Sequence, residues 1–243
     1  MTNKVIEQKK YSAEEQQRLL HALAEQLKLP LLQISRQAEL VSLTNDLAAL
    51  DTVRMTANSA LQLLDNYLLS TRLNGGQVEV ALEPVSLSAV LQDTAQHLYE
   101  VAGLYQCELE LHLAGRYEPV MAHRAGLEAA LTSLGYVFIE AQSAQPHKRR
   151  PVVTLAAHRS RWGIVGGLYA DLEGLSTDMY TRAQTLYGRA RQPLTQLSAS
   201  NGAGVFVADA LLSSMSANLR IAHHRKLTGL AATFQPSKQL SLV

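Results

Sequence analysis

The sequence predicts an α+β fold in which an N-terminal antiparallel helical hairpin, residues 1–74, precedes an α/β sandwich, residues 75–243, with helices on one face of a mixed sheet. Apolar residues recur at alternating spacings of three and four through residues 20–41 and 50–68, the pattern of helices that pack on other helices. After residue 76, strand-like and helical segments follow one another, an order typical of helices packed on a sheet.

Capping and turn residues mark the ends of both hairpin helices in the sequence. Ser12 followed by Glu15 forms a capping box at the start of the first helix. Thr44-Asn45-Asp46 separates the two helices, and Gly75-Gly76 ends the second. A single hairpin leaves an apolar stripe in water, and pairing two copies into a four-helix bundle buries it. We therefore expect a homodimer through residues 13–74.

After residue 76, we expect strands and helices to be interspersed along the chain. Strands are expected at residues 78–82, 108–113, 119–122, 152–157, 164–170, 218–222 and 230–234. Helices are expected at residues 86–105, 125–144, 178–187 and 205–215. A polar stretch, residues 188–202, shows no periodicity.

Composition limits the function classes. The chain has 243 residues and a formal net charge of +1, which gives no general electrostatic attraction for nucleic acid or an anionic membrane. The basic run at residues 147–150 has no interleaved aromatic residues for base stacking. The first ten residues lack the apolar core of a signal peptide, and no stretch is long enough for a membrane helix, so we expect a cytoplasmic protein. Cys107, in an expected strand, is interpreted as a buried reduced thiol.

Three strings in the sequence resemble those of one family. Ala24-Glu25-Gln26-Leu27-Lys28-Leu29-Pro30-Leu31 resembles the phosphoacceptor box of the histidine kinases of two-component signalling, and residues 64–73 resemble that family's exit from its helical hairpin. Residues 229–236 resemble its last strand. The resemblance covers about residues 13–236. It implies a dimerisation and phosphotransfer hairpin followed by a GHKL-type ATPase-like domain.

The resemblance implies that the phosphoacceptor histidine is missing. Alignment on Pro30 and Leu31 places Glu25 at that position, and a carboxylate cannot form a phosphoramidate. His21 lies one turn earlier on the helix and is the fallback phosphoacceptor. No catalytic residue is therefore expected unless His21 serves.

The nucleotide site is also degenerate by this resemblance. Ser133 and Val137 stand where the family has two asparagines, and valine has no oxygen for Mg²⁺. If a nucleotide site is retained, the resemblance assigns it to four residues: Asp171, Gly174, Gly202 and Gly204. The two later glycines precede an expected helix, where backbone N–H groups can face a phosphate, although a tight turn explains them equally well.

These losses favour a pseudo-histidine kinase: a regulator or scaffold of two-component-type signalling that acts through its dimer bundle. By resemblance, the docking face for a response-regulator receiver domain or a true histidine kinase would comprise four residues: Glu25, Gln26, Lys28 and Leu29. No cofactor and no nucleic-acid or membrane partner is expected.

Two alternatives stay open. One is a switch that binds ATP or ADP without turnover, and the other is a divergent histidine kinase or phosphotransferase that uses His21. No metal site is expected; His223 and His224 are adjacent in a strand-like stretch and so point to opposite faces.

Overall fold

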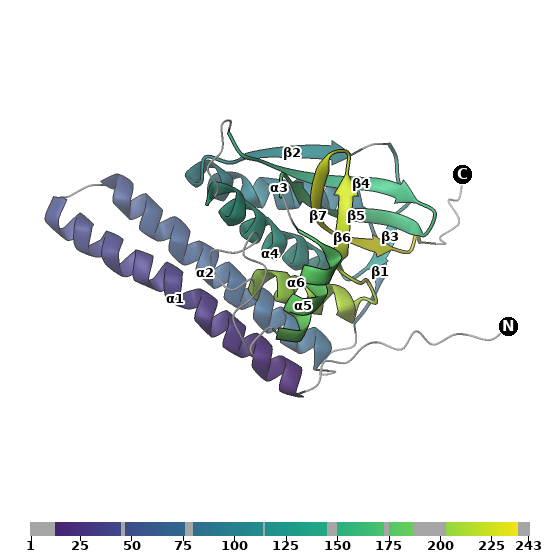
Figure 1. The fold of residues 1–243 in the computed structure, drawn as a ribbon, viewed down its shortest axis with the longest axis horizontal. Helices are drawn as coiled ribbons and strands as arrows, with labels where there is room; N and C mark the ends of the chain where they lie inside the picture. Colours follow the sequence, from purple (N-terminus) through teal and green to yellow (C-terminus); the bar gives the residue numbers. More distant parts are fainter. Residues whose placement is uncertain are drawn as a thin grey trace.

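The computed structural model describes residues 13–44, 47–75, 80–113, 115–144, 150–172, 175–186 and 203–237. Two long antiparallel helices lie along one side of the molecule, and the sheet lies on the other, with further helices between them (Figure 1). The fold is the α+β arrangement that the sequence predicts.

The hairpin consists of α1 (Ala13–Thr44) and α2 (Leu47–Asn74). Pro30 lies inside α1, and α2 ends at Asn74, directly before the glycine pair. The predicted capping residues Ser12, Asn45 and Asp46 lie outside the described residues.

The main sheet has the strand order β2-β4-β5-β7-β6. The parallel pair is β2 (Glu108–Leu113) with β4 (Val152–Ser160). The remaining neighbours are antiparallel: β5 (Gly163–Ala170), β7 (Leu227–Phe234) and β6 (Arg220–His224). The sheet is therefore mixed, as predicted. A separate two-stranded ribbon joins β1 (Glu83–Val85) to β3 (Val120–Ala122).

In the described residues, four helices follow the hairpin: α3 (Leu87–Leu104), α4 (Arg124–Ser143), α5 (Thr177–Leu186) and α6 (Ala203–Ser214). Each of the first two begins at a side-chain cap. The Ser86 hydroxyl accepts from the Ala89 N–H, and His123 Nδ1 accepts from the Gly126 N–H. These bonds satisfy donors that the first turn of a helix leaves free.

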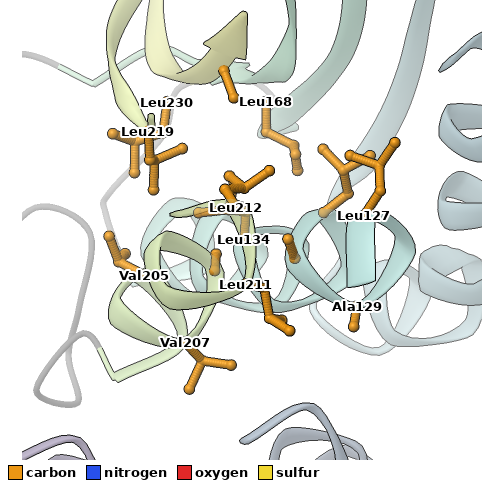
Figure 2. Close-up of a cluster of buried hydrophobic side chains, with 14 of the residues drawn as sticks. Leu127, Ala129, Leu134, Leu168, Val205, Val207, Leu211, Leu212, Leu219 and Leu230 are labelled. Carbon is orange, nitrogen blue, oxygen red and sulfur yellow. The ribbon is translucent and has the colours of Figure 1, made fainter. Parts of the chain in front are cut away.

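Helices α4 and α6 lie side by side under one face of the sheet, and their buried side chains meet those of β5 and β7 (Figure 2). Along the strands, alternate residues such as Leu155, Leu168 and Leu230 point into this core. Leucines of both hairpin helices, Leu19, Leu23 and Leu63, belong to the same core. The hairpin is thus packed onto the rest of the chain through a continuous apolar interior.

One predicted strand is wrong. The alternation at residues 78–82 predicts a strand there, but residues 80–82 are not in a strand and β1 covers Glu83–Val85. Residues 76–79 lie outside the described part of the chain. The partner strand β3 has only three residues, and they pair with Glu83, Pro84 and Val85. Residues 80–82 therefore have no partner in β3.

Candidate functional site

The first feature of the candidate site is the close contact between α4 and α6. A Cβ atom built on Gly204 would lie 2.7 Å from Val137 Cγ2 and 3.0 Å from the Ser133 carbonyl oxygen. Both distances are shorter than side chains normally allow, so the first turn of α6 lies directly on α4. The three positions that the resemblance associates with the metal ligand and the phosphate loop are therefore in contact with one another, with no space for a ligand between Gly204 and Val137.

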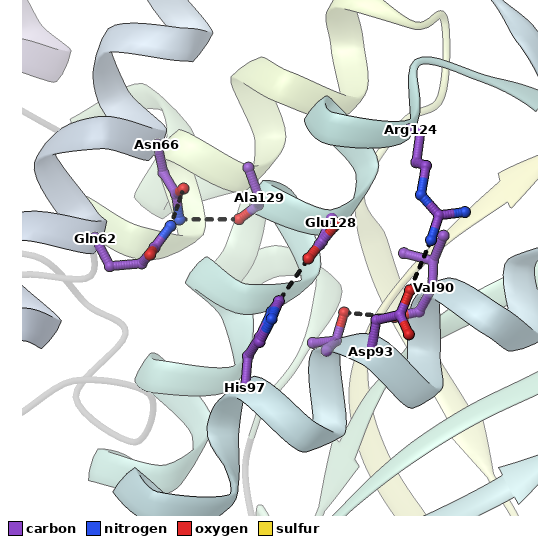
Figure 3. A network of polar contacts seen from close by, with 9 residues as sticks. Gln62, Asn66, Val90, Asp93, His97, Arg124, Glu128 and Ala129 are labelled. Atoms are coloured by element: carbon purple, nitrogen blue, oxygen red, sulfur yellow. Dashed lines mark hydrogen bonds and ion pairs between the residues drawn. The ribbon is translucent and has the colours of Figure 1, made fainter.

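The second feature is a hydrogen-bond network that joins α2 to the same part of α4. Asn66 is 3% exposed, and its Nδ2 donates to Ser133 Oγ at 2.9 Å and to the Ala129 carbonyl oxygen at 3.2 Å. Its Oδ1 accepts from Gln62 Nε2 at 3.0 Å (Figure 3). The serine at the aligned asparagine position is thus hydrogen-bonded to the hairpin.

Two further buried polar residues of α2 extend this hydrogen-bonded contact toward the end of the helix. Asn66, Ser70 and Asn74 are spaced by four and are all buried, so they form one stripe on the helix. Asn74 Nδ2 donates to the Ser70 carbonyl oxygen at 2.8 Å and to the Ala210 carbonyl oxygen of α6 at 3.0 Å. The hairpin is therefore fixed to both α4 and α6 by buried amide groups, whose loss would leave main-chain acceptors without these partners.

Two solvent-accessible clefts flank this seam, and Tyr136 lines both of them. One, of about 640 Å³, lies between both hairpin helices and the ends of α3 and α4; the other, of about 1000 Å³, lies between α2 and the polar sides of α3 and α4. Burial raises the pKa of Tyr136, while a hydrogen bond with the Ser59 side chain lowers it in part. Burial, helped by the nearby Glu140, raises the pKa of Tyr105 in the first cleft to about 12.

Polar side chains of α3 and α4 contact one another at and beside the second cleft, which His97 and Glu128 line (Figure 3). His97 Nδ1 lies 3.1 Å from Glu128 Oε1. Beside them, Arg124 donates to Asp93 at 2.7 Å. Since these side chains are partly exposed, the pairs contribute little to stability.

The helix that carries the predicted docking face is described, but only part of that face is. His21 and Lys28 are exposed on α1. Glu25, Gln26 and Leu29 lie in α1, and their side chains lie outside the described part. The roles of these residues stay predictions.

The predicted nucleotide-site residues fall at three places. Asp171 is exposed just after β5, and its carbonyl oxygen accepts from Gln142 Nε2 at 3.0 Å. Gly204 lies in the first turn of α6, in the contact with α4. Gly174 and Gly202 lie outside the described residues. The structure thus brings Gly204 into contact with Val137 and Ser133. The resemblance places all three residues around the nucleotide site.

Sequence reasoning missed the buried asparagines of α2. Their signal was present, because three small polar residues spaced by four interrupt an otherwise leucine-rich helix. Such a stripe indicates a polar contact with another element and not an exposed face. A group of three histidines on the sheet was also missed, because they lie on three different strands.

Comparison with known proteins gives a consistent result for the fold. No protein-family model matches the chain, and no curated protein matches it. Among solved structures, the chain is similar to histidine kinase ThkA in its complex with response regulator TrrA, with a TM-score of 0.57 and 10% identity over 93% of this chain and 62% of that one. It is also similar to the Acinetobacter baumannii histidine kinase AdeS, with a TM-score of 0.55 and 12% identity over 87% of this chain and 98% of that one.

The chain has the fold of a histidine-kinase core. A third similar structure is full-length ShkA in complex with AMPPNP, with a TM-score of 0.53 and 16% identity over 79% of this chain and 40% of that one. None of the described helices combines the length and hydropathy that a membrane span requires. Within the described ranges, no three His, Cys, Asp or Glu side chains are placed to hold a metal ion.

Proposed function

We propose that this chain is a non-catalytic regulator or scaffold of two-component signalling, with residues 1–74 as its dimerisation part and residues 75–243 as a degenerate ATPase-like part. The observation that carries the proposal is the contact of Gly204 with Val137 and Ser133. The histidine-kinase fold is present, while the helices that the resemblance assigns to the phosphates and the metal pack on each other.

The chemistry of these positions supports the loss of phosphotransfer. Mg²⁺ in nucleotide sites is held by oxygen ligands, and Val137 offers none. The Ser133 hydroxyl already accepts a hydrogen bond from Asn66 in a fully buried place. A nucleotide would have to separate α4 from α6 and also break the contact with α2, and both steps cost buried interactions.

The hairpin offers the dimerisation surface. Its helices expose several large apolar side chains to solvent: Leu20, Leu31, Leu32, Leu40, Leu50, Leu61 and Leu68. Leu50, Leu61 and Leu68 are spaced by 11 and seven, so they lie on one face of α2. Pairing this face with that of a second copy removes it from water, and so the proposal includes a homodimer with a four-helix bundle.

The partner would be a response-regulator receiver domain or an active histidine kinase. This part rests on the resemblance of residues 24–31 to a phosphoacceptor box and on the similarity to ThkA, whose structure was solved with a response regulator. Lys28 is exposed on this part of α1, where a partner can reach it. Glu25 carries a negative charge at the aligned phosphoacceptor position.

The first test is a calorimetric titration of the full chain with ATP and ADP, with and without Mg²⁺. We expect no heat of binding and no thermal stabilisation at millimolar nucleotide. Magnesium-dependent binding at micromolar concentration would refute the closed site. Incubation with labelled ATP, in the wild type and in His21→Ala, separates the remaining alternative, since an acid-labile label lost in the variant would identify a phosphotransferase.

The dimer is tested by light scattering over a range of protein concentrations. We expect a dimer in the wild type and a monomer in Leu61→Glu, because a carboxylate at that position would be buried in the bundle. The matched control is Leu111→Glu, which makes the same change at an exposed leucine of β2. A wild-type monomer at every concentration would contradict the proposal. For docking, Glu25→Ala should weaken receiver binding, whereas Glu39→Ala on the same helix should not.

A further inference from the structure

The five-stranded sheet curls until its two edge strands meet. β2 and β6 are the first and last strands in the order, and four spacings of about 4.8 Å would put them about 19 Å apart in a flat sheet. Yet Nδ1 of His112 on β2 lies 3.2 Å from Nε2 of His224 at the end of β6. The β6–β7 hairpin must therefore turn toward the face of the sheet opposite the main core.

This curl encloses a second, small apolar cluster. Ala156, Val165, Tyr169 and Ala231 are buried there, from three strands, and Leu227 packs against them. The cluster is separate from the main core under α4 and α6. Contact between the two edges of the sheet therefore helps to keep these apolar side chains out of water.

Three histidines and a tyrosine lie together where the two edges of the sheet meet. The His224 ring lies 5.3 Å from His112, 5.8 Å from His158 on β4 and 5.3 Å from Tyr169 on β5, between ring centroids. His158 Nδ1 and Tyr169 Oη are buried and have no hydrogen-bond partner in the described chain. A proton on His158 Nδ1 would therefore find no acceptor in the described chain.

The charged neighbours determine which ring can take a proton. Glu110 Oε2 lies 3.2 Å from His112 Nε2, so this carboxylate accepts the Nε2–H and can balance a charge on His112. His224 has no such partner in the described chain; it faces His112, His158 and Arg225. Burial, followed by repulsion from these three groups, lowers the pKa of His224 below its ordinary 6.5. Burial also lowers the pKa of His158, and Arg220 is the cation near Tyr169.

We propose that His112, His158 and His224 form an acid-sensitive clasp, which joins the two edges of the sheet at neutral pH and releases the β6–β7 hairpin when the cluster gains protons. At neutral pH, one ring donates to the other across the 3.2 Å contact, which requires at least one unprotonated nitrogen. When both rings are charged, neither nitrogen can accept and the two cations repel. The opening would expose the small cluster around Val165.

The direction of the pH effect follows from proton linkage. A histidine whose pKa is lower in the folded chain than in the unfolded chain takes up its proton more readily on unfolding. Its contribution is complete above pH 6.5 and is lost as the pH falls through the lower, folded value. Each unit of difference is a tenfold change in the folded-to-unfolded ratio.

The test uses amide hydrogen exchange of the full chain between pH 7.5 and pH 5.5, with a chelator present and with rates corrected for intrinsic exchange. We expect protection in residues 220–234 to fall on acidification in the wild type and to stay nearly constant in His224→Phe, whose ring cannot be protonated. The matched control is His223→Gln, which alters the neighbouring, exposed histidine and should behave like the wild type.

A second measurement keeps the proposal testable if His224→Phe fails to fold. The imidazole signals of the wild type, followed by NMR over the same range, should show His158 and His224 gaining protons below pH 6.5 as protection of residues 220–234 is lost. If protection is the same at both pH values, or if His224→Phe and His223→Gln depend on pH equally, the clasp does not exist.

Discussion

The amide of Asn66 provides a quantitative test of how the hairpin is attached. Asn66→Ala removes two neutral hydrogen bonds to α4, to Ser133 Oγ and to the Ala129 carbonyl oxygen. Each such bond contributes about 1 kcal/mol net, so the free energy of unfolding should fall by about 2 kcal/mol. That loss corresponds to about a thirtyfold change in the folded-to-unfolded ratio.

A double-mutant cycle isolates the part that passes through Ser133. One of the two bonds ends on the Ser133 side chain and the other on the main chain, so Asn66→Ala and Ser133→Ala should show a coupling energy of about 1 kcal/mol. The control is Gln62→Ala, which removes an exposed donor to the same amide and should cost well under 1 kcal/mol.

The assay is urea unfolding followed by far-ultraviolet circular dichroism, at one fixed protein concentration because the proposed dimer would stabilise the folded chain. A cost for Asn66→Ala no larger than that for Gln62→Ala would show that the buried amide does not hold the hairpin. A coupling energy near zero would show that Ser133 is not its partner in solution.

Three further predictions follow from the structure. Gly204→Ala should lower the free energy of unfolding by about 1–3 kcal/mol because its methyl group meets Val137, and the loss should be smaller in a Val137→Ala background, as measured by the same urea titration. Burial raises the pKa of the Cys107 thiol to about 11, from 9.0, so alkylation of the folded chain at pH 8 should be about a hundredfold slower than in urea, and equal rates would contradict its burial. Arg124→Gln breaks a half-exposed ion pair with Asp93 and should cost less than about 1 kcal/mol; a larger loss would mean that the pair is shielded from water.

Most of the fold could be predicted because local signals and tertiary packing agree. The strand at residues 108–113 was predicted with its observed bounds, and the helix predicted at residues 86–105 is present as α3, within one residue at each end. The prediction of a strand at residues 78–82 was wrong because a strand needs a neighbouring strand to pair with. The partner, β3, is only three residues long, and the alternation within residues 78–82 does not reveal that length.

The candidate site was less predictable from sequence. The structure places Gly204 in contact with Ser133 and Val137. The resemblance assigns these three residues to the nucleotide site. It gave no indication that α2 would supply Asn66 to the same place, because that contact joins residues far apart in the chain. The histidine contact between β2 and β6 depends on the curl of the whole sheet, which no local pattern contains.

The hydrogen bond between Asn66 and Ser133 also bears on how this chain can evolve. Ser133 is completely buried, and its hydroxyl is matched to the amide of a neighbouring helix. An asparagine at position 133 would bring a larger side chain into a filled space and set one amide against another. A metal-binding site at these positions would therefore require coordinated substitutions on three helices, since Asn66, Ser133, Val137 and Gly204 constrain one another.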